Sequence, residues 1–268
     1  MPSSTDPRLS GLRRRSGRVY LAAPTPVPEG FVPLAGFAPG QPPREAQAAA
    51  FRAGRAKGRR DYAEAVLAKQ LGEWAGEALA ITLVDDGLVL DLSQAEVFLD
   101  WGENGRLDAV HLGAIALAEP SPESLHAAAT AITRLLDPIF SGRGRGFGRT
   151  ASWRTFIDGL MSHAASWARQ TRHDCRPAMD AVLPLAEAVI AAAGLRLNPR
   201  VDWVPIEGDT LAVPIKSACC LIYRVRERPE SPIGGYCTIC PLIPDVARAE
   251  PVREALVRER RLTRPGAA

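Results

Sequence analysis

The sequence predicts an α+β fold that is dominated by helices, with a small antiparallel β-meander and a C-terminal segment that carries a cysteine cluster. Three observations support this prediction. Apolar residues recur at helical spacing in several long stretches, β-branched runs with two turn signals occupy residues 80–113, and four of the five cysteines fall within residues 219–240. A chain of 268 residues can bury a full core, so it needs no disulfide to fold.

Changes in composition divide the chain into three predicted parts. Residues 1–43 are rich in Pro, Gly, Ser and Arg, which predicts a flexible N-terminal arm. Residues 44–210 form a helical α+β domain, and residues 211–268 form the cysteine-bearing segment with a terminal helix. The arginines at 13–15 could touch acidic lipid in a transient membrane-surface association, but a solvated arm is the expected state.

The first predicted helix is followed by strands. Asp61 is a candidate N-cap, and Leu67, Leu71, Trp74 and Ala78 share one helical face. Residues 81–84 and 88–90 are expected to be strands joined by a turn at Asp85-Asp86-Gly87. Residues 97–99 and 110–112 are expected to form a hairpin around Asn104-Gly105, which completes a meander over residues 80–113.

Further helices are predicted after the meander. Ser121 should cap the first, with Pro122 at its first position, and Ser152 should cap the second. A third should run from about Met179 to a stop at Gly194, and a charged helix should cover residues 252–262.

Charge and hydropathy narrow the class of protein. The formal net charge of +3 is too small to predict a nucleic-acid partner. There is no run of eighteen apolar residues and no apolar stretch after the N-terminal arginines, so we expect a cytoplasmic protein. In the cytoplasm thiols stay reduced, and clustered cysteines bind metal more often than each other.

The cysteine pattern is the strongest signal in the chain. Cys219 and Cys220 are adjacent, sixteen residues follow, and Cys237 and Cys240 then form a C-x-x-C pair. Four thiolates can complete a tetrahedral zinc site or an iron–sulfur site. Adjacent ligands are unusual for structural zinc, which favours gaps of two to four residues, whereas a two-iron cluster offers two separate metal atoms.

Four other interpretations of these cysteines stay open, of which four unrelated buried thiols is the one that their close grouping least favours. A zinc knuckle would make the chain a zinc-stabilised, non-catalytic binding module. A redox dithiol of Cys237 and Cys240 would need a thioredoxin-like context, which Pro241 fits poorly. A 2Fe–2S sensor without turnover would use the same four ligands. The fifth cysteine, Cys175, is expected to be a free thiol.

The motif resembles that of a known family. Cys219-Cys220-Leu221-Ile222-Tyr223-Arg224, followed by Cys237-Thr238-Ile239-Cys240-Pro241-Leu242, is similar to the C-terminal signature of FhuF-type ferric-siderophore reductases. The match covers about residues 216–242. The family's usual spacer is about ten residues and here it is sixteen, a loop difference that costs little closure entropy.

The resemblance implies an activity, a cofactor and partners. It implies a 2Fe–2S cluster on Cys219, Cys220, Cys237 and Cys240, and reduction of siderophore-bound ferric iron to ferrous iron in cellular iron homeostasis. Residues near the motif are candidate contacts to a ferric siderophore: Lys216, Tyr223, Arg224, Arg226 and Tyr236. No dinucleotide-binding fingerprint is present in the sequence, so electrons are expected from an external donor such as a ferredoxin or a flavin reductase.

Overall fold

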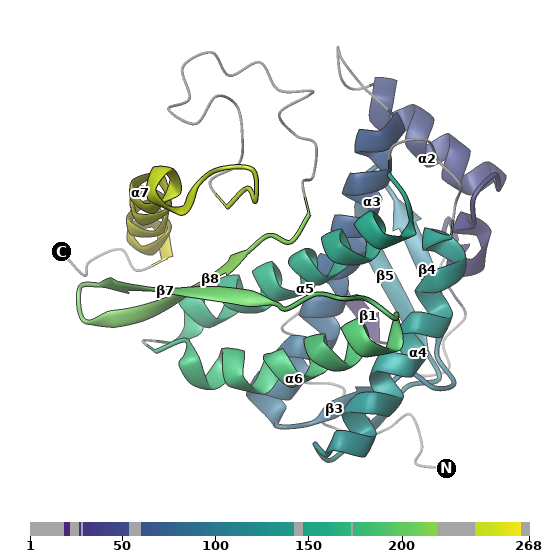
Figure 1. The fold of residues 1–268 in the computed structure, drawn as a ribbon. Coiled ribbons are helices and arrows are strands. Elements are labelled where there is room, and N and C mark those ends of the chain that lie inside the picture. Colours follow the sequence, from purple (N-terminus) through teal and green to yellow (C-terminus); the bar gives the residue numbers. More distant parts are fainter. Residues whose placement is uncertain are drawn as a thin grey trace.

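Helices form most of the structure, which is a computed structural model and is described here for residues 19–21, 27, 29–53, 60–141, 147–172, 174–218 and 239–263. The elements are six α-helices, short 3-10 and π-helical turns, and strands in one four-stranded and two two-stranded sheets within these ranges. The predicted helix-dominated α+β class is confirmed. Figure 1 shows the central helices between the larger sheet and a long hairpin, with the C-terminal helix beside the hairpin.

The centre of the molecule is the pair α3 (Arg60–Ala75) and α5 (Arg149–Thr171). Their backbones approach so closely that a Cβ at Gly72 would lie 2.0 Å from the carbonyl oxygen of Phe156. On α5, a Cβ at Gly159 would lie 2.5 Å from the carbonyl oxygen of Lys69. Glycine is therefore required at both positions. The predicted apolar face of the first helix is confirmed, because all four of its residues are buried: Leu67, Leu71, Trp74 and Ala78.

Two further helices, α4 (Pro122–Phe140) and α6 (Arg176–Ala192), pack beside α5 and complete the helical layer. Ser121 caps α4 as predicted: its hydroxyl accepts the Ser124 N–H at 3.1 Å, and Ser124 returns a bond to the Ser121 N–H. The predicted stop of α6 is also confirmed, since Gly194 follows its end with φ of 67°.

The predicted cap at Ser152 is wrong. Helix α5 begins three residues earlier, with Gly148 at its N-cap position. Ser152 lies inside the first turn and is buried, and its hydroxyl donates back to the Gly148 carbonyl at 3.3 Å. A serine that bonds the carbonyl four residues earlier is a common alternative to capping.

The larger sheet has the order β1-β5-β4-β2, formed by β1 (Val19–Leu21), β5 (Leu107–Gly113), β4 (Glu96–Trp101) and β2 (Val32–Pro33). Strands β4 and β5 form the predicted hairpin, and Gly105 in its turn has φ of 70°. Strand β1 pairs with β5 in parallel, whereas β2 pairs with β4 in the antiparallel sense.

The predicted strand over residues 81–84 is wrong, because the chain stays helical beyond α3. Two π-helical turns, η2 (Gly76–Ala80) and η3 (Thr82–Asp86), extend α3 as far as Gly87. Gly87 has φ of 63° and ends the helix in the left-handed conformation. The Asp-Asp-Gly signal was therefore a helix stop and not a hairpin turn.

The prediction of a single meander over residues 80–113 is also wrong. Strand β3 (Val89–Asp91) does not pair with β4 but with β6 (Ala116–Ala118), in a separate two-stranded antiparallel sheet. This pairing joins segments that are separated by the whole β4–β5 hairpin, so no local turn signal in the sequence predicts it.

The packed body begins ahead of residue 44. Leu34 and Phe37 in the turn η1 (Leu34–Phe37) are buried in the core. Arg44, at the start of α2 (Pro42–Ala53), donates to the Phe37 carbonyl at 3.0 Å and pairs with Glu64. The prediction of a flexible arm therefore does not fit residues 29–43. Residues 1–18, 22–26 and 28 of the predicted arm lie outside the described residues.

The described residues of the C-terminal part form a hairpin and a helix. The hairpin β7 (Arg200–Ile206) and β8 (Asp209–Ile215) crosses α5 and α6, and α7 (Asp245–Thr263) lies beside it (Figure 1). Helix α7 begins before the predicted residue 252, with Pro251 inside it. Among the described residues, no helix combines the length and apolar character needed to cross a bilayer.

Candidate functional site

One of the four predicted ligands lies in the described part of the chain. Cys240 is 2% exposed, is not in a disulfide, and occupies a turn in which its carbonyl accepts the Ile243 N–H at 3.2 Å. The other predicted ligands and four of the predicted substrate contacts lie outside the described residues: Cys219, Cys220, Cys237, Tyr223, Arg224, Arg226 and Tyr236.

A buried carboxylate on α5 holds the chain just before the first cysteine pair. Asp158 Oδ1 accepts the backbone N–H and the hydroxyl of Ser217, each at 2.8 Å. Asp158 Oδ2 accepts the backbone N–H of Ala218 at 3.1 Å. The residue that directly precedes Cys219 is therefore fixed to the central helix.

Burial raises the pKa of Asp158 from 3.8 to about 6. The cause is loss of hydration around the carboxylate, and the three hydrogen bonds from Ser217 and Ala218 oppose it only in part. The nearby charge of Lys216 also lowers this pKa. At neutral pH the carboxylate is ionised and accepts all three bonds.

The chain returns to the same region just before Cys240. Ile239 packs against the core and lines a cavity of about 500 Å³, open to solvent, between α5, β8 and α7. Ser162 and Pro214 line this cavity and also line a smaller one beside Asp158 and Ser217. The two ends of the cysteine-bearing segment are thus anchored on neighbouring parts of α5 and β8.

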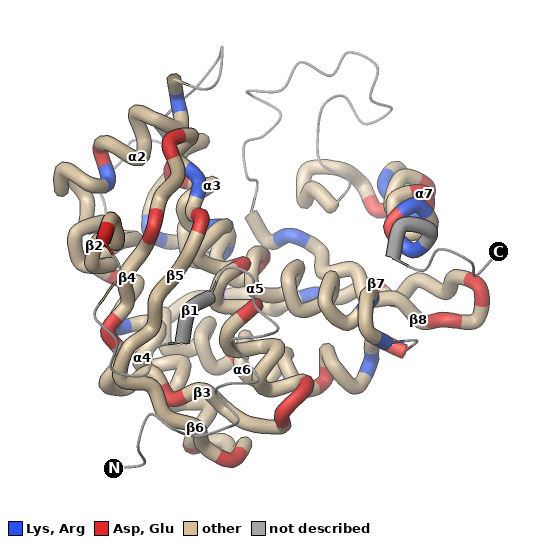
Figure 2. Tube along the Cα trace, turned by 180° about the vertical axis from the view of Figure 1, so that it is seen from behind, with Lys and Arg blue, Asp and Glu red and all other residues tan. Residues whose placement is uncertain are grey.

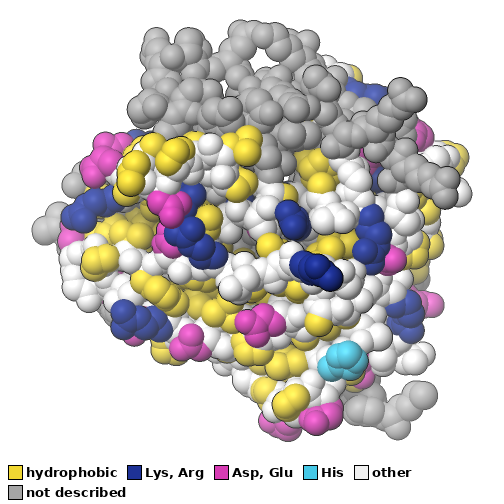
Figure 3. Space-filling model, in the orientation of Figure 1, with side chains coloured by type: hydrophobic (Ala, Val, Ile, Leu, Met, Phe, Trp, Pro, Cys, Tyr) yellow, Lys and Arg dark blue, Asp and Glu magenta, His cyan; other side chains and the backbone are white. Residues whose placement is uncertain are grey.

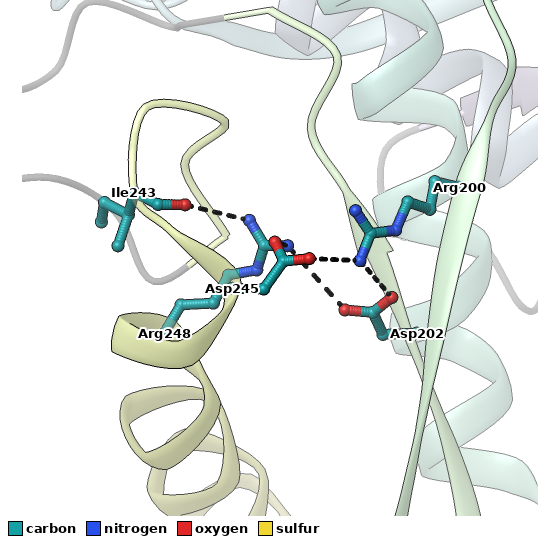
Figure 4. A network of polar contacts seen from close by, with 5 residues as sticks. All are labelled: Arg200, Asp202, Ile243, Asp245 and Arg248. Carbon is teal, nitrogen blue, oxygen red and sulfur yellow. Dashed lines mark hydrogen bonds and ion pairs between the residues drawn. The ribbon is translucent and has the colours of Figure 1, made fainter.

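An arginine–carboxylate network holds the turn after Cys240 (Figure 4). Arg200 on β7 donates to Asp245 at 2.8 Å and to Asp202 at 3.2 Å. Arg248, which is 4% exposed, pairs with Asp245 and donates to the Ile243 carbonyl at 3.4 Å. The hydrogen bond from Arg200 lowers the pKa of Asp245, so this carboxylate stays ionised and keeps α7 joined to the hairpin.

Two more ion pairs attach the C-terminal half of α7 to the rest of the fold. Arg169 on α5 pairs with Glu259 at 3.1 Å and donates to the Ala212 carbonyl of β8 at 2.8 Å. Arg260 pairs with Asp209, which is buried at the start of β8. Figure 2 shows basic and acidic positions along α7. These ion pairs hold α7 against α5 and β8. The turn that carries Cys240 leads directly into α7, so its position is fixed relative to both elements.

The surface around this site is partly apolar and partly basic. Leu242 and Val246, close after Cys240, are 55% and 89% exposed. Lys216, the predicted substrate contact that is described, lines the small cavity with Arg200. Figure 3 shows Lys and Arg side chains, together with several Asp and Glu side chains, spread between hydrophobic ones across the face that carries the hairpin.

The described ligand candidate, the Cys240 thiol, is of the type that binds soft or borderline metals. Cys240 supplies one thiol on a short, anchored turn. Within the described ranges, no group of three or more His, Cys, Asp or Glu side chains could hold a metal ion. Any further ligands of a site at Cys240 would therefore come from residues outside the described ranges.

Cys175 is set apart from this arrangement. It is fully buried in the core at the start of α6, and its backbone N–H donates to the Thr210 carbonyl at 3.0 Å. Burial raises the pKa of its thiol, which keeps it protonated and unreactive. The prediction of a free thiol is confirmed.

Sequence reasoning missed the residues that anchor the site. Asp158 gave one signal, a charged residue inside the apolar run Phe156-Ile157-Asp158-Gly159-Leu160. No local pattern pointed to the network after Cys240, because its members lie in two segments more than forty residues apart: Arg200 and Asp202 in one, and Asp245 and Arg248 in the other.

Comparison with known proteins identifies no relative: no family model, no curated protein and no solved structure matches the chain.

Proposed function

We propose that this chain is an iron–sulfur oxidoreductase that reduces siderophore-bound ferric iron to ferrous iron. The observation that carries the proposal is the pattern Cys-Cys, sixteen residues, Cys-x-x-Cys, together with the anchoring of both of its flanks on α5 and β8. The ligands would be Cys219, Cys220, Cys237 and Cys240.

A 2Fe–2S cluster supplies one-electron transfer when it is bound. The chain's own residues would place it. Asp158 fixes the backbone ahead of Cys219, and the Arg200–Asp245–Arg248 network fixes the turn after Cys240. The exposed Leu242 and Val246 indicate that Cys240 lies close to the surface, which suits electron exchange with a bulky chelate or a donor protein.

The electron balance requires two partners. An external donor, a ferredoxin or a flavin reductase, gives one electron, and the ferric ion of the substrate accepts it. Siderophore oxygens hold ferrous iron far less well than ferric iron, so reduction releases the metal. Lys216, which lines the small cavity beside the segment, would attract anionic ferric complexes.

The reductase activity can be tested directly. Protein purified without oxygen is mixed with a chemical one-electron donor and ferric hydroxamate or catecholate complexes, and ferrous iron is trapped with a coloured chelator. We expect catalytic release of ferrous iron by the natural protein and by the Cys175→Ala variant, and background release by Cys240→Ala. A protein that takes up electrons but does not pass them to any ferric complex would be a sensor and not a reductase.

A further inference from the structure

A second cavity lies away from the cysteine segment, between α3, its π-helical extension η2, strand β5 and helix α5. It is open to solvent and offers about 160 Å³ of room, which is less than the usual range for drug-sized ligands and suits a smaller molecule. The lining residues are Gln70, Glu73, Trp74, Glu77, Leu107, Asp108, Ala109, Val110 and His163. Of the residues around the cysteine flanks, none lines this cavity.

The cavity is acidic. Glu73, Glu77 and Asp108 contribute carboxylates, and Glu73 is paired with Lys69 on the same helix. Glu77 and Asp108 have no ion-pair partner among the described residues. Figure 2 shows acidic positions on the strands beside α3. Two uncompensated carboxylates at one cavity favour a cationic occupant.

Two buried polar atoms of the wall also lack partners. Trp74 is 5% exposed, and its Nε1–H donates to no acceptor among the described residues. Gln70 lies one helical turn earlier on α3, and its Oε1 is buried without a donor. Buried polar groups are nearly always hydrogen-bonded in folded proteins, so each such atom calls for a partner. A ligand with N–H donors near Gln70 and an acceptor near Trp74 would satisfy both.

The backbone of the wall is also unusual. Glu77 belongs to the π-helical turn η2, and π-turns within helices occur frequently at functional sites. Gly76 allows α5 to approach this turn, because a Cβ there would lie 2.8 Å from both the His163 Cβ and the Leu160 carbonyl oxygen. The close approach places His163 beside Glu77 and Asp108 in one cavity.

We propose that this cavity binds a small organic amine that also carries a hydrogen-bond acceptor, such as a carbonyl oxygen. Glu77 and Asp108 would pair with the ammonium group, and the Trp74 N–H would donate to the acceptor. A metal ion is disfavoured, because no group of three or more ligating side chains comes together within the described ranges. The inference does not depend on the proposed reductase function.

Binding can be measured by titration calorimetry on the full-length protein at constant ionic strength, with putrescine and N-acetylputrescine as probes, of which only the second carries a carbonyl acceptor. The variants Glu77→Gln and Asp108→Asn each remove one charge with little change in shape, and Glu103→Gln removes an exposed charge from the same hairpin as Asp108. We expect at least one amine to bind, with an affinity about tenfold lower in each cavity variant and unchanged in Glu103→Gln. Neutral 1,4-butanediol should not bind.

Three results would overturn the proposal. The first is no heat from either amine at millimolar concentration. The second is binding that Glu77→Gln and Asp108→Asn leave unchanged, which would indicate non-specific attraction. The third is a response to Mg²⁺ or Mn²⁺, and not to the amines, that Glu77→Gln abolishes, because this would make the cavity a metal site.

Discussion

Asp158 on α5 and Ser217 after β8 are joined by two hydrogen bonds to one carboxylate oxygen, each 2.8 Å long, across 59 residues of sequence. A third bond from Ala218 fixes the chain immediately before Cys219. A buried charge in the central helix therefore holds the chain up to the residue before the first cysteine pair.

The first prediction concerns pH. The pKa of Asp158 is raised from 3.8 to about 6, so the folded protein binds this proton more tightly than the unfolded chain does. The contribution of this group to stability is complete below about pH 4 and is lost as the pH rises through 6. The shift from 3.8 to about 6 corresponds to a loss of roughly 3 kcal/mol between these limits.

The measurement is urea unfolding of the natural protein and of Asp158→Asn from pH 4 to pH 7. The difference between the two proteins isolates this carboxyl, because other groups titrate in both. The exposed Asp180→Asn variant is the matched control. A difference that does not change with pH would show that Asp158 titrates in the folded protein as it does in the unfolded chain.

The second prediction concerns the cysteines. Cys240→Ala, and equally Cys219→Ala, Cys220→Ala or Cys237→Ala, should lower the iron content to near zero, because a 2Fe–2S cluster needs four protein ligands. Cys175→Ala should keep its iron, since Cys175 is fully buried in the core at the start of α6. Iron is counted per chain after purification without oxygen. Loss of iron in Cys175→Ala with full retention in Cys240→Ala would reverse the assignment.

The third prediction concerns the packing of α3 on α5. Gly72→Ala should destabilise the protein by about 3 kcal/mol or prevent folding, since the new Cβ would lie 2.0 Å from the backbone oxygen of Phe156. In Gly113→Ala the nearest atom would be 3.7 Å away, so this variant should unfold close to the natural midpoint. Equal urea midpoints for the two variants would mean that α3 and α5 are not in such close contact.

The fourth prediction concerns the attachment of α7. Arg260→Ala removes the ion-pair partner of Asp209, which is 6% exposed, and should cost about 3 kcal/mol because a buried charge loses compensation. Arg258→Ala changes an exposed arginine of the same helix and should cost less than 1 kcal/mol. The free energies of unfolding of both variants are compared, and similar values would place Asp209 in a well-hydrated environment.

Local patterns predicted the helices well. The spacing of Leu67, Leu71 and Trp74 identified a buried face, and Ser121-Pro122 identified a helix start. The same logic failed at Asp85-Asp86-Gly87, because Asp-Gly is common both in hairpin turns and at helix ends, and only tertiary packing decides between them.

Contacts between distant segments could not be predicted. The pairing of β3 with β6 and the bonds of Asp158 to Ser217 depend on how the helices pack, which leaves no periodic trace in the sequence. For the site, the sequence identified the candidate ligand Cys240, but not Arg248 or Asp245, which hold its turn in place.

The most direct test of the central claim is an absorption spectrum of protein purified without oxygen, with iron and zinc counted on the same sample. The account predicts visible sulfur-to-iron bands that bleach on reduction and about two irons per chain. A colourless protein that contains zinc, and that takes up no iron on reconstitution under reducing conditions, would contradict the cluster and the reductase function together.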